Sequence, residues 1–227
     1  MQRIRSTSGT RQVRRAGFLM ALILVGAPIP IWGQSTPAAV PAASPAPAYQ
    51  IEGFRSAHFG MGENEVTTAI KEDFKVSNAD IRRSVQPVEQ TSALTIAAKD
   101  VVDGTGGPVE ISYIFGYRSK KLIQVNLIWT GTGAANRDRL NRVTALLRGY
   151  FMQRDLRRDN MVVDAQLPDG SILVFSGSDV QNRQVQLLIH TETPAGASQT
   201  ATPALVRLAY IADVMKPDVY SIPDGQF

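Results

Sequence analysis

The feature that most constrains the fold is an order of hydrophobic periodicities that occurs twice along the chain. Apolar residues first recur at helical spacing, as Val66, Ile70 and Phe74, and three runs with strand character follow. A second helical stripe runs from Asn136 to about Arg154, and three or four strand-like runs come after it. Helical spacing predicts an amphipathic helix, and alternation of apolar and polar residues predicts a half-buried strand. The order therefore predicts two α-β-β-β units.

The turns between the strand-like runs predict how the strands pair. The predicted helices are 63–74 and 136–154, and the predicted strands are 92–98, 109–117, 121–130, 161–166, 171–176, 184–191 and 204–212. Short turns such as 118–120 and 167–170 make antiparallel neighbours of the strands that they join. Within 121–130 the apolar face is formed by Ile123, Val125, Leu127 and Trp129, whereas Gln124 and Asn126 face away. We expect an α+β fold in which the two α-β-β-β units form one antiparallel sheet and both helices pack on one face.

The first 35 residues predict a secretory signal peptide. Five arginines precede an uncharged apolar run, Ala16–Ala27, which Pro28 and Pro30 end. Basic, apolar and small residues in this order are typical of exported proteins, and a membrane span needs about 20 apolar residues. We expect a periplasmic protein without a transmembrane span after cleavage. The general secretory route is favoured over the twin-arginine route, and an uncleaved N-terminal anchor is the alternative.

The rest of the chain divides into a linker and one domain. Residues 36–49 are rich in proline and alanine, a composition that stays extended because it buries little apolar area. Residues 50–227 follow as a single α+β domain with two halves, 50–132 and 133–227.

Composition excludes several classes of function. Five of the 24 basic residues precede residue 36 and no acid does, which leaves 19 basic against 20 acidic residues. A nucleic-acid binder carries a concentrated basic patch, so nucleic acid is not an expected partner. The chain has no cysteine, which excludes disulfides, a thiolate nucleophile and an iron–sulfur cluster.

No residues are predicted to form a catalytic, cofactor or metal site. Neither His58 nor His190 has a second ligand at the spacing of a metal site. Ser176 and Ser178 flank a glycine, but no helix follows, so they predict a hairpin turn and not a nucleophile elbow. The glycine-rich segment 104–107 precedes a strand and lacks the helix N-terminus that binds phosphate. We therefore expect no enzymatic activity and no cofactor.

Two surface features leave alternatives open. Arginines flank the second predicted helix on both sides of its apolar stripe, which is typical of a solvated rim, and peripheral contact with anionic lipid is the alternative. These arginines are Arg137, Arg139, Arg142, Arg148, Arg154, Arg157 and Arg158. The tail after Ala212 is apolar enough to pack either on the sheet or on a partner.

The segment Phe59-Gly60-Met61, followed by Val66, resembles the start of domains of the BamE-like and β-lactamase-inhibitory-protein-like group. The resemblance covers about ten residues and the order of the elements. Gly62 stands where that group usually has Ser or Thr. The resemblance implies a tandem α-β-β-β envelope domain that is not catalytic and binds other proteins, with Gly60 and Met61 in structural roles.

These observations predict a non-catalytic periplasmic or envelope domain that binds or scaffolds another envelope protein through its sheet face or its tail. A small-ligand or lipid-binding protein is the first alternative, and it requires a closed apolar pocket of at least about 300 Å³ between helices and sheet. An exported hydrolase is the second, and it requires titratable groups that converge in a cleft.

Overall fold

The structure is a computed structural model of the chain, and it describes residues 48–102, 107–131, 133–192, 202–222 and 225–226. The predicted signal peptide, most of the predicted linker and most of the glycine-rich segment 104–107 lie outside these residues. Within the described ranges, no helix combines the length and the apolar character that a membrane span requires.

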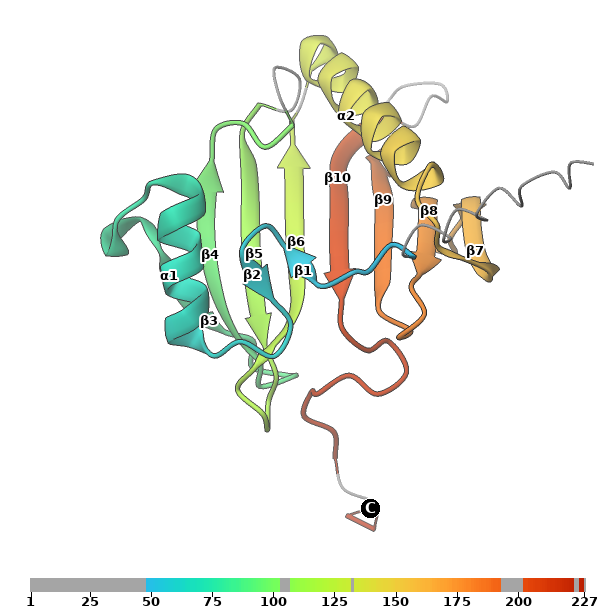
Figure 1. The fold of residues 1–227 in the computed structure, drawn as a ribbon. Coiled ribbons are helices and arrows are strands. Elements are labelled where there is room, and N and C mark those ends of the chain that lie inside the picture. The colour runs from blue at the N-terminus through green and yellow to red at the C-terminus, as the bar shows by residue number, and fades with distance from the viewer. Residues whose placement is uncertain (1–47, 103–106, 132, 193–201, 223–224, 227) are drawn as a thin grey trace, which may run out of the picture. The chain divides into compact units, whose positions relative to one another are not determined.

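Eight strands form one antiparallel sheet in the order β3-β4-β5-β6-β10-β9-β8-β7 (Figure 1). The first half contributes β3 (Arg82–Val85), β4 (Ser92–Ala98), β5 (Val109–Phe115) and β6 (Leu122–Thr130). The second half contributes β7 (Arg157–Gln166), β8 (Ile172–Ser178), β9 (Gln184–Glu192) and β10 (Thr202–Ile211). Each half is a meander of consecutive strands. The last strands of the two meanders pair in the middle of the sheet, where Leu127 of β6 lies opposite Leu208 of β10.

The remaining elements precede or separate these two meanders. A small hairpin of β1 (Gly53–Phe54) and β2 (Ala57–His58) leads into α1 (Glu63–Phe74), and the 3-10 helix η1 (Asn78–Asp80) follows. The long helix α2 (Ala134–Met152) connects β6 to β7. The prediction of a helix over 63–74 is confirmed, and the second helix begins two residues earlier than the predicted start at Asn136.

The predicted fold class, two α-β-β-β units with both helices on one face of the sheet, is wrong. The described part is mainly β, with a two-stranded and an eight-stranded antiparallel sheet and two α-helices. Each α-helix is followed by four strands of the large sheet. The prediction missed β3 because all four of its residues are exposed and therefore show no apolar alternation. It also began β7 too late, because that strand starts in a charged stretch at Arg157.

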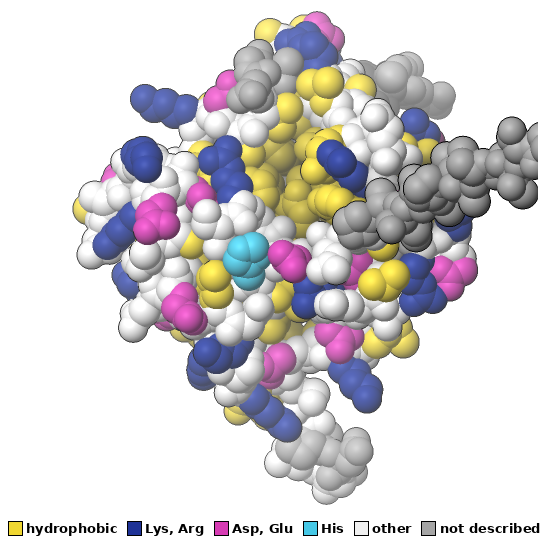
Figure 2. Space-filling view, in the orientation of Figure 1, with side chains coloured by type: hydrophobic (Ala, Val, Ile, Leu, Met, Phe, Trp, Pro, Cys, Tyr) yellow, Lys and Arg dark blue, Asp and Glu magenta, His cyan; other side chains and the backbone are white. Residues whose placement is uncertain are grey.

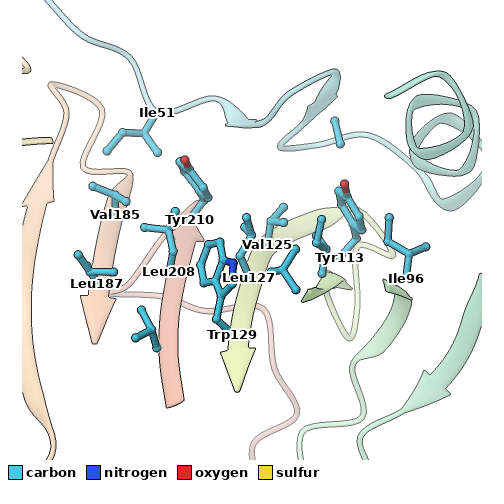
Figure 3. Close-up of a cluster of buried hydrophobic side chains, with 14 of the residues drawn as sticks. Ile51, Ile96, Tyr113, Val125, Leu127, Trp129, Val185, Leu187, Leu208 and Tyr210 are labelled. Atoms are coloured by element: carbon cyan, nitrogen blue, oxygen red, sulfur yellow. The ribbon is translucent and has the colours of Figure 1, made fainter. Parts of the chain in front are cut away.

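One face of the large sheet carries the hydrophobic core. Side chains alternate between the two faces of a strand, and Val125, Leu127 and Trp129 of β6 point to this face with 0 % exposure. Figure 3 shows them beside Leu208 and Tyr210 of the neighbouring strand β10. The helices contribute further buried side chains to the same cluster: Val66, Ala69 and Ile70 from α1, and Leu140, Val143 and Phe151 from α2. Burial of this apolar surface is the main driving force for folding.

Candidate binding groove on the open face

The opposite face of the large sheet, which we call the open face, carries a different set of side chains. Strand register places amides and aliphatic residues on it in its central part: Ser112 and Ile114 on β5, Gln124, Asn126 and Ile128 on β6, Arg207, Ala209 and Ile211 on β10, and Gln184, Gln186 and Leu188 on β9. Five of these eleven side chains are aliphatic and six are polar or charged, so this face is too polar to form a second hydrophobic core.

Hydrogen bonds between side chains order the polar part of the open face. The hydroxyl oxygens of Thr95 and Ser112 lie 2.9 Å apart on neighbouring strands. The Gln124 amide nitrogen donates to the Asn126 carbonyl oxygen at 2.8 Å on β6. On β9 the Gln186 amide nitrogen donates to Gln184 at 2.7 Å. These bonds restrict the side chains of the open face.

Two adjoining hollows of about 390 and 460 Å³ form a groove on the open face. The two hollows share Glu89, Thr91, Ile114 and Asn126, so they are continuous. The floor of the groove consists of β4, β5, β6 and β10. The turn between β3 and β4 forms one wall, and residues 212–219, at the start of the C-terminal segment, form the other.

Hydrogen bonds hold the C-terminal wall against two turns of the sheet. The Tyr117 N–H donates to the carbonyl oxygen of Asp218 at 2.8 Å, and the Asp218 carboxylate accepts from the N–H groups of Arg118 and Ser119 at 3.0 and 2.9 Å. Two residues later, the Tyr220 N–H donates to the Glu89 carbonyl oxygen at 2.8 Å. The segment thus joins the β5–β6 turn to the β3–β4 turn. The backbone of this segment therefore lies against the protein's own turns, whereas the apolar tail residues Met215 and Ile222 are 85 % and 54 % exposed.

Hydrogen bonds also stabilise the ionised form of the Asp218 carboxylate and engage the Asp213 carboxylate of the same wall. The Ser119 hydroxyl and the N–H groups of Arg118 and Ser119 hold the pKa of Asp218 below its usual range. The Asp213 carboxylate accepts from the N–H groups of Met215 and Lys216 at 2.9 and 3.0 Å. Both carboxylates stay negatively charged at neutral pH, and their oxygens accept hydrogen bonds from the segment itself and from the β5–β6 turn.

The two histidines lie outside the groove. His58 is exposed and lies 3.8 Å from the Glu52 carboxylate. His190 Nδ1 lies 3.0 Å from the Ser171 hydroxyl oxygen. Among the described residues, no three His, Cys, Asp or Glu side chains are grouped closely enough to hold a metal ion.

Ser171 and His190 lie close enough together to be considered as a nucleophile and its general base. Asp169 is the adjacent acid: it accepts the Ser171 N–H at 2.9 Å, and this bond together with nearby His190 lowers its pKa. A nucleophile must reach its substrate, but Ser171 is only 1 % exposed. The three residues fasten the 167–171 turn to β9, and this is the role that their geometry supports.

Ser176 and Ser178 do not lie in a hairpin turn, so that prediction is wrong. Both belong to β8 and are 3 % exposed. The turn comes later, because the Asp179 carboxylate accepts the N–H groups of Gln181 and Arg183, and Asn182 adopts a left-handed conformation with φ 62°. The strand therefore continues through both serines.

A smaller hollow lies between α2 and the core face. Its volume is about 160 Å³, and its lining is apolar or aromatic, with Leu147, Tyr150 and Tyr210 among the lining residues. Figure 2 shows hydrophobic side chains exposed on this side of the molecule. The volume is about half of the roughly 300 Å³ typical of the smallest ligand pockets.

Several arginines around α2 have individual partners within the fold. Arg148 pairs with Asp164 at 2.7 Å, and Arg157 pairs with Asp159. The Arg154 guanidinium lies 3.8 Å from the centre of the Tyr150 ring. These contacts tie the arginines to β7 and to the end of α2.

The segment Phe59-Gly60-Met61 has a structural role. Gly60 has φ 88° and donates its N–H to the Leu122 carbonyl oxygen at 3.0 Å, and the Leu122 N–H donates to Met61 at 2.8 Å. The segment therefore fixes the entry of α1 against the start of β6.

Comparison with known proteins adds no assignment, since no protein-family model, curated protein or solved structure matches the chain. The resemblance to BamE-like and β-lactamase-inhibitory-protein-like domains stays a prediction.

Proposed function

We propose that this chain is a non-catalytic, exported domain of the cell envelope that holds another protein in the groove of its open face. The observation that carries the proposal is the groove itself, with hollows of about 390 and 460 Å³ that share four residues. Each hollow lies in the size range of functional binding sites. The continuous shape suits an extended segment of a protein better than a compact small molecule.

The chemistry of the floor suits a polypeptide. A peptide backbone offers N–H and C=O groups at every residue, and the amides of Gln124 and Asn126 can donate to or accept from them. Ile114 and Ile211 lie beside these amides and offer apolar contact to side chains. Interfaces between proteins combine these two kinds of contact.

The carboxylates and tyrosines with a resolved pKa shift do not move into the range that a general acid or base uses. General acids and bases work best with a pKa near the operating pH. Resolved shifts move the carboxylates of Asp80, Asp159, Asp169 and Asp218 further below neutrality, through hydrogen bonds with neighbouring groups. The shifted tyrosines move upward because they are buried. Both shifts move the pKa values of these groups further from neutral pH.

Site-specific photo-crosslinking in cells that naturally produce the protein tests the proposal. A photoreactive amino acid at Ile128, on the open face, is expected to give discrete protein adducts. The same amino acid at Leu146 of α2, which is 49 % exposed, is the matched control and is expected to give none of these adducts.

A groove-filling variant adds a second measurement. Asn126 lines both hollows, so Asn126→Trp should remove the Ile128 adducts while leaving the thermal unfolding midpoint nearly unchanged. Identical adducts from Ile128 and Leu146, or adducts that survive Asn126→Trp in a folded protein, would contradict the proposal. Cell fractionation of the same strains tests export, because the adducts and the processed chain should then occur in the envelope fraction.

A further inference from the structure

We infer that the partner segment bound in the groove is acidic and that one of its carboxylates pairs with the guanidinium of Arg207. This inference rests on the proposed function and adds the chemistry of the ligand to it.

Arg207 occupies the middle of the open face. It lies on β10, opposite Ile128 of β6 and Leu188 of β9. Its neighbours in sequence, Val206 and Leu208, are buried in the core, so the alternation of the strand directs Arg207 to the other face. There it lines the 390 Å³ hollow together with Gln124 and Asn126.

Arg207 lacks a partner within the described part of the chain. Its Nε is buried and donates no hydrogen bond, and the side chain forms no ion pair there. The residues opposite it on both neighbouring strands are aliphatic and offer no acceptor. Glu110, opposite Ile128 on the far side of β6, is already paired with Arg82. A guanidinium presents five N–H donors in a planar fork that fits a carboxylate, and at Arg207 this fork is unused.

Among the described residues, the acids that line the hollow with Arg207 are Glu89, Asp213 and Asp218, and none of them forms an ion pair with its guanidinium. The carboxylates of Asp213 and Asp218 accept backbone N–H groups and so are engaged away from Arg207, and Lys216 is the second cation of this hollow. Glu89 is the acid on the opposite wall. It repels a carboxylate from the β3–β4 side and so directs the partner's acid towards β10.

A protein carboxylate fits this site better than a phosphate does. Phosphate sites usually gather several cationic or N–H donors around one group, whereas the residues directly opposite Arg207 on both neighbouring strands are aliphatic. These aliphatic neighbours suit the hydrocarbon part of an Asp or Glu side chain and the residues that flank it.

Selection from a random peptide library displayed on phage tests the inference. The bait is the full chain as the cell processes it, and parallel selections use Arg207→Gln and Arg142→Gln. Arg142 is an exposed arginine of α2 and serves as the matched control. We expect Asp or Glu to be enriched at one peptide position with the wild-type protein and with Arg142→Gln, and not with Arg207→Gln.

The best selected peptide then enters a double-mutant cycle measured by fluorescence polarisation. Replacing its acid by the corresponding amide should weaken binding to the wild type by about ten-fold, because a hydrogen-bonded charge pair is lost. The same replacement should leave the affinity for Arg207→Gln nearly unchanged. Inorganic phosphate at equal ionic strength should not displace the peptide.

The outcomes separate the two proposals. Peptides that compete for the groove, as judged by loss of binding to Asn126→Trp, but show no acidic preference would overturn the inference and leave the proposed function standing. The same applies if Arg207→Gln selects the same acidic peptides as the wild type, or if phosphate displaces them. A selection without any groove-dependent peptide would count against both.

Discussion

The backbone N–H of Ile51 donates to the carboxylate of Asp179 at 2.9 Å, across 128 residues of chain. Both residues are 1 % exposed. The other oxygen of this carboxylate accepts the N–H groups of Gln181 and Arg183 at 2.8 and 3.0 Å. One buried side chain therefore shapes the β8–β9 turn and fastens the start of the domain to it.

Removal of this carboxylate should destabilise the whole domain. Asp179→Ala leaves the buried Ile51 N–H and two turn N–H groups without their acceptor, which we expect to lower the free energy of unfolding by about 2–4 kcal/mol. Equilibrium unfolding in urea measures the change. Asp159→Ala removes an exposed carboxylate paired with Arg157 and should have little effect. Equal effects of the two substitutions would contradict the assigned role of Asp179.

The position of the C-terminal wall depends on Gly116, which lies against the Asp218 carboxylate. A Cβ on Gly116 would overlap the Asp218 carboxylate and would lie 2.7 Å from the Ser119 hydroxyl oxygen. Gly116→Ala should therefore displace residues 213–220, expose them to proteolysis, and lower the free energy of unfolding by about 1–3 kcal/mol. Limited proteolysis and urea unfolding test this. Gly149→Ala is the control, since a Cβ at this position of α2 meets nothing within 4 Å. It should raise the unfolding free energy by about 0.5–1 kcal/mol.

The anchoring of the C-terminal segment should depend on acid pH. The pKa of Asp218 in the folded protein lies below the ordinary value of 3.8, because the Ser119 hydroxyl and two N–H groups stabilise the charged form. The ionised Asp218 carboxylate therefore stabilises the fold fully above the ordinary pKa. This stabilisation is lost as the pH falls through the lower pKa of the folded state. In an NMR titration the amide signals of Arg118 and Ser119 should shift at a pH below 3.8. Asp218→Asn should abolish this shift of the amide signals. A shift with its midpoint at or above 3.8 would contradict the lowered pKa of Asp218.

Alkaline pH should destabilise the N-terminal start of the domain, around Tyr49. Burial, followed by the neighbouring Tyr150, raises the pKa of Tyr49 from 10.0 to about 12. Because the pKa of Tyr49 is higher in the folded state, the stabilisation that the neutral side chain provides is complete below the unfolded pKa. It is lost as the pH rises through the folded pKa. Between pH 10 and 12 the wild type should therefore lose more stability than Tyr49→Phe. Urea unfolding across this pH range, with tyrosinate absorbance recorded in parallel, checks the difference.

Strong local periodicity made part of the fold predictable. The helical spacing of Val66, Ile70 and Phe74 predicts α1 with the observed bounds, and the apolar, β-branched run 92–98 predicts β4 with the observed bounds. By contrast, β3 exists because β4 offers it hydrogen-bond partners, and its own four exposed residues carry no pattern. A strand stabilised by its neighbour leaves little signal in its own sequence.

The groove was harder to predict than the sheet. Gln124 and Asn126 were correctly placed away from the apolar face, since alternation alone determines that. Ile123 was assigned to the apolar face but lines the groove, because the register shifts between Ile114 and Phe115. The C-terminal wall follows from contacts between residues about 100 positions apart, such as Arg118 and Asp218. No local pattern encodes such a contact.

Adjacent residues on β6 provide a direct test of the two faces. Leu127 is 0 % exposed and points into the core, so Leu127→Ala should lower the free energy of unfolding by about 2–5 kcal/mol. Ile128 is half-buried on the open face, and Ile128→Thr keeps a β-branched side chain there, so it should change stability by less than about 1 kcal/mol. Urea unfolding of both variants measures this contrast. If the open face binds a partner, Ile128→Thr should weaken that binding while the protein stays folded, because it removes apolar contact area beside Arg207. A large loss of stability in Ile128→Thr would instead mean that the protein's own structure covers this part of the open face.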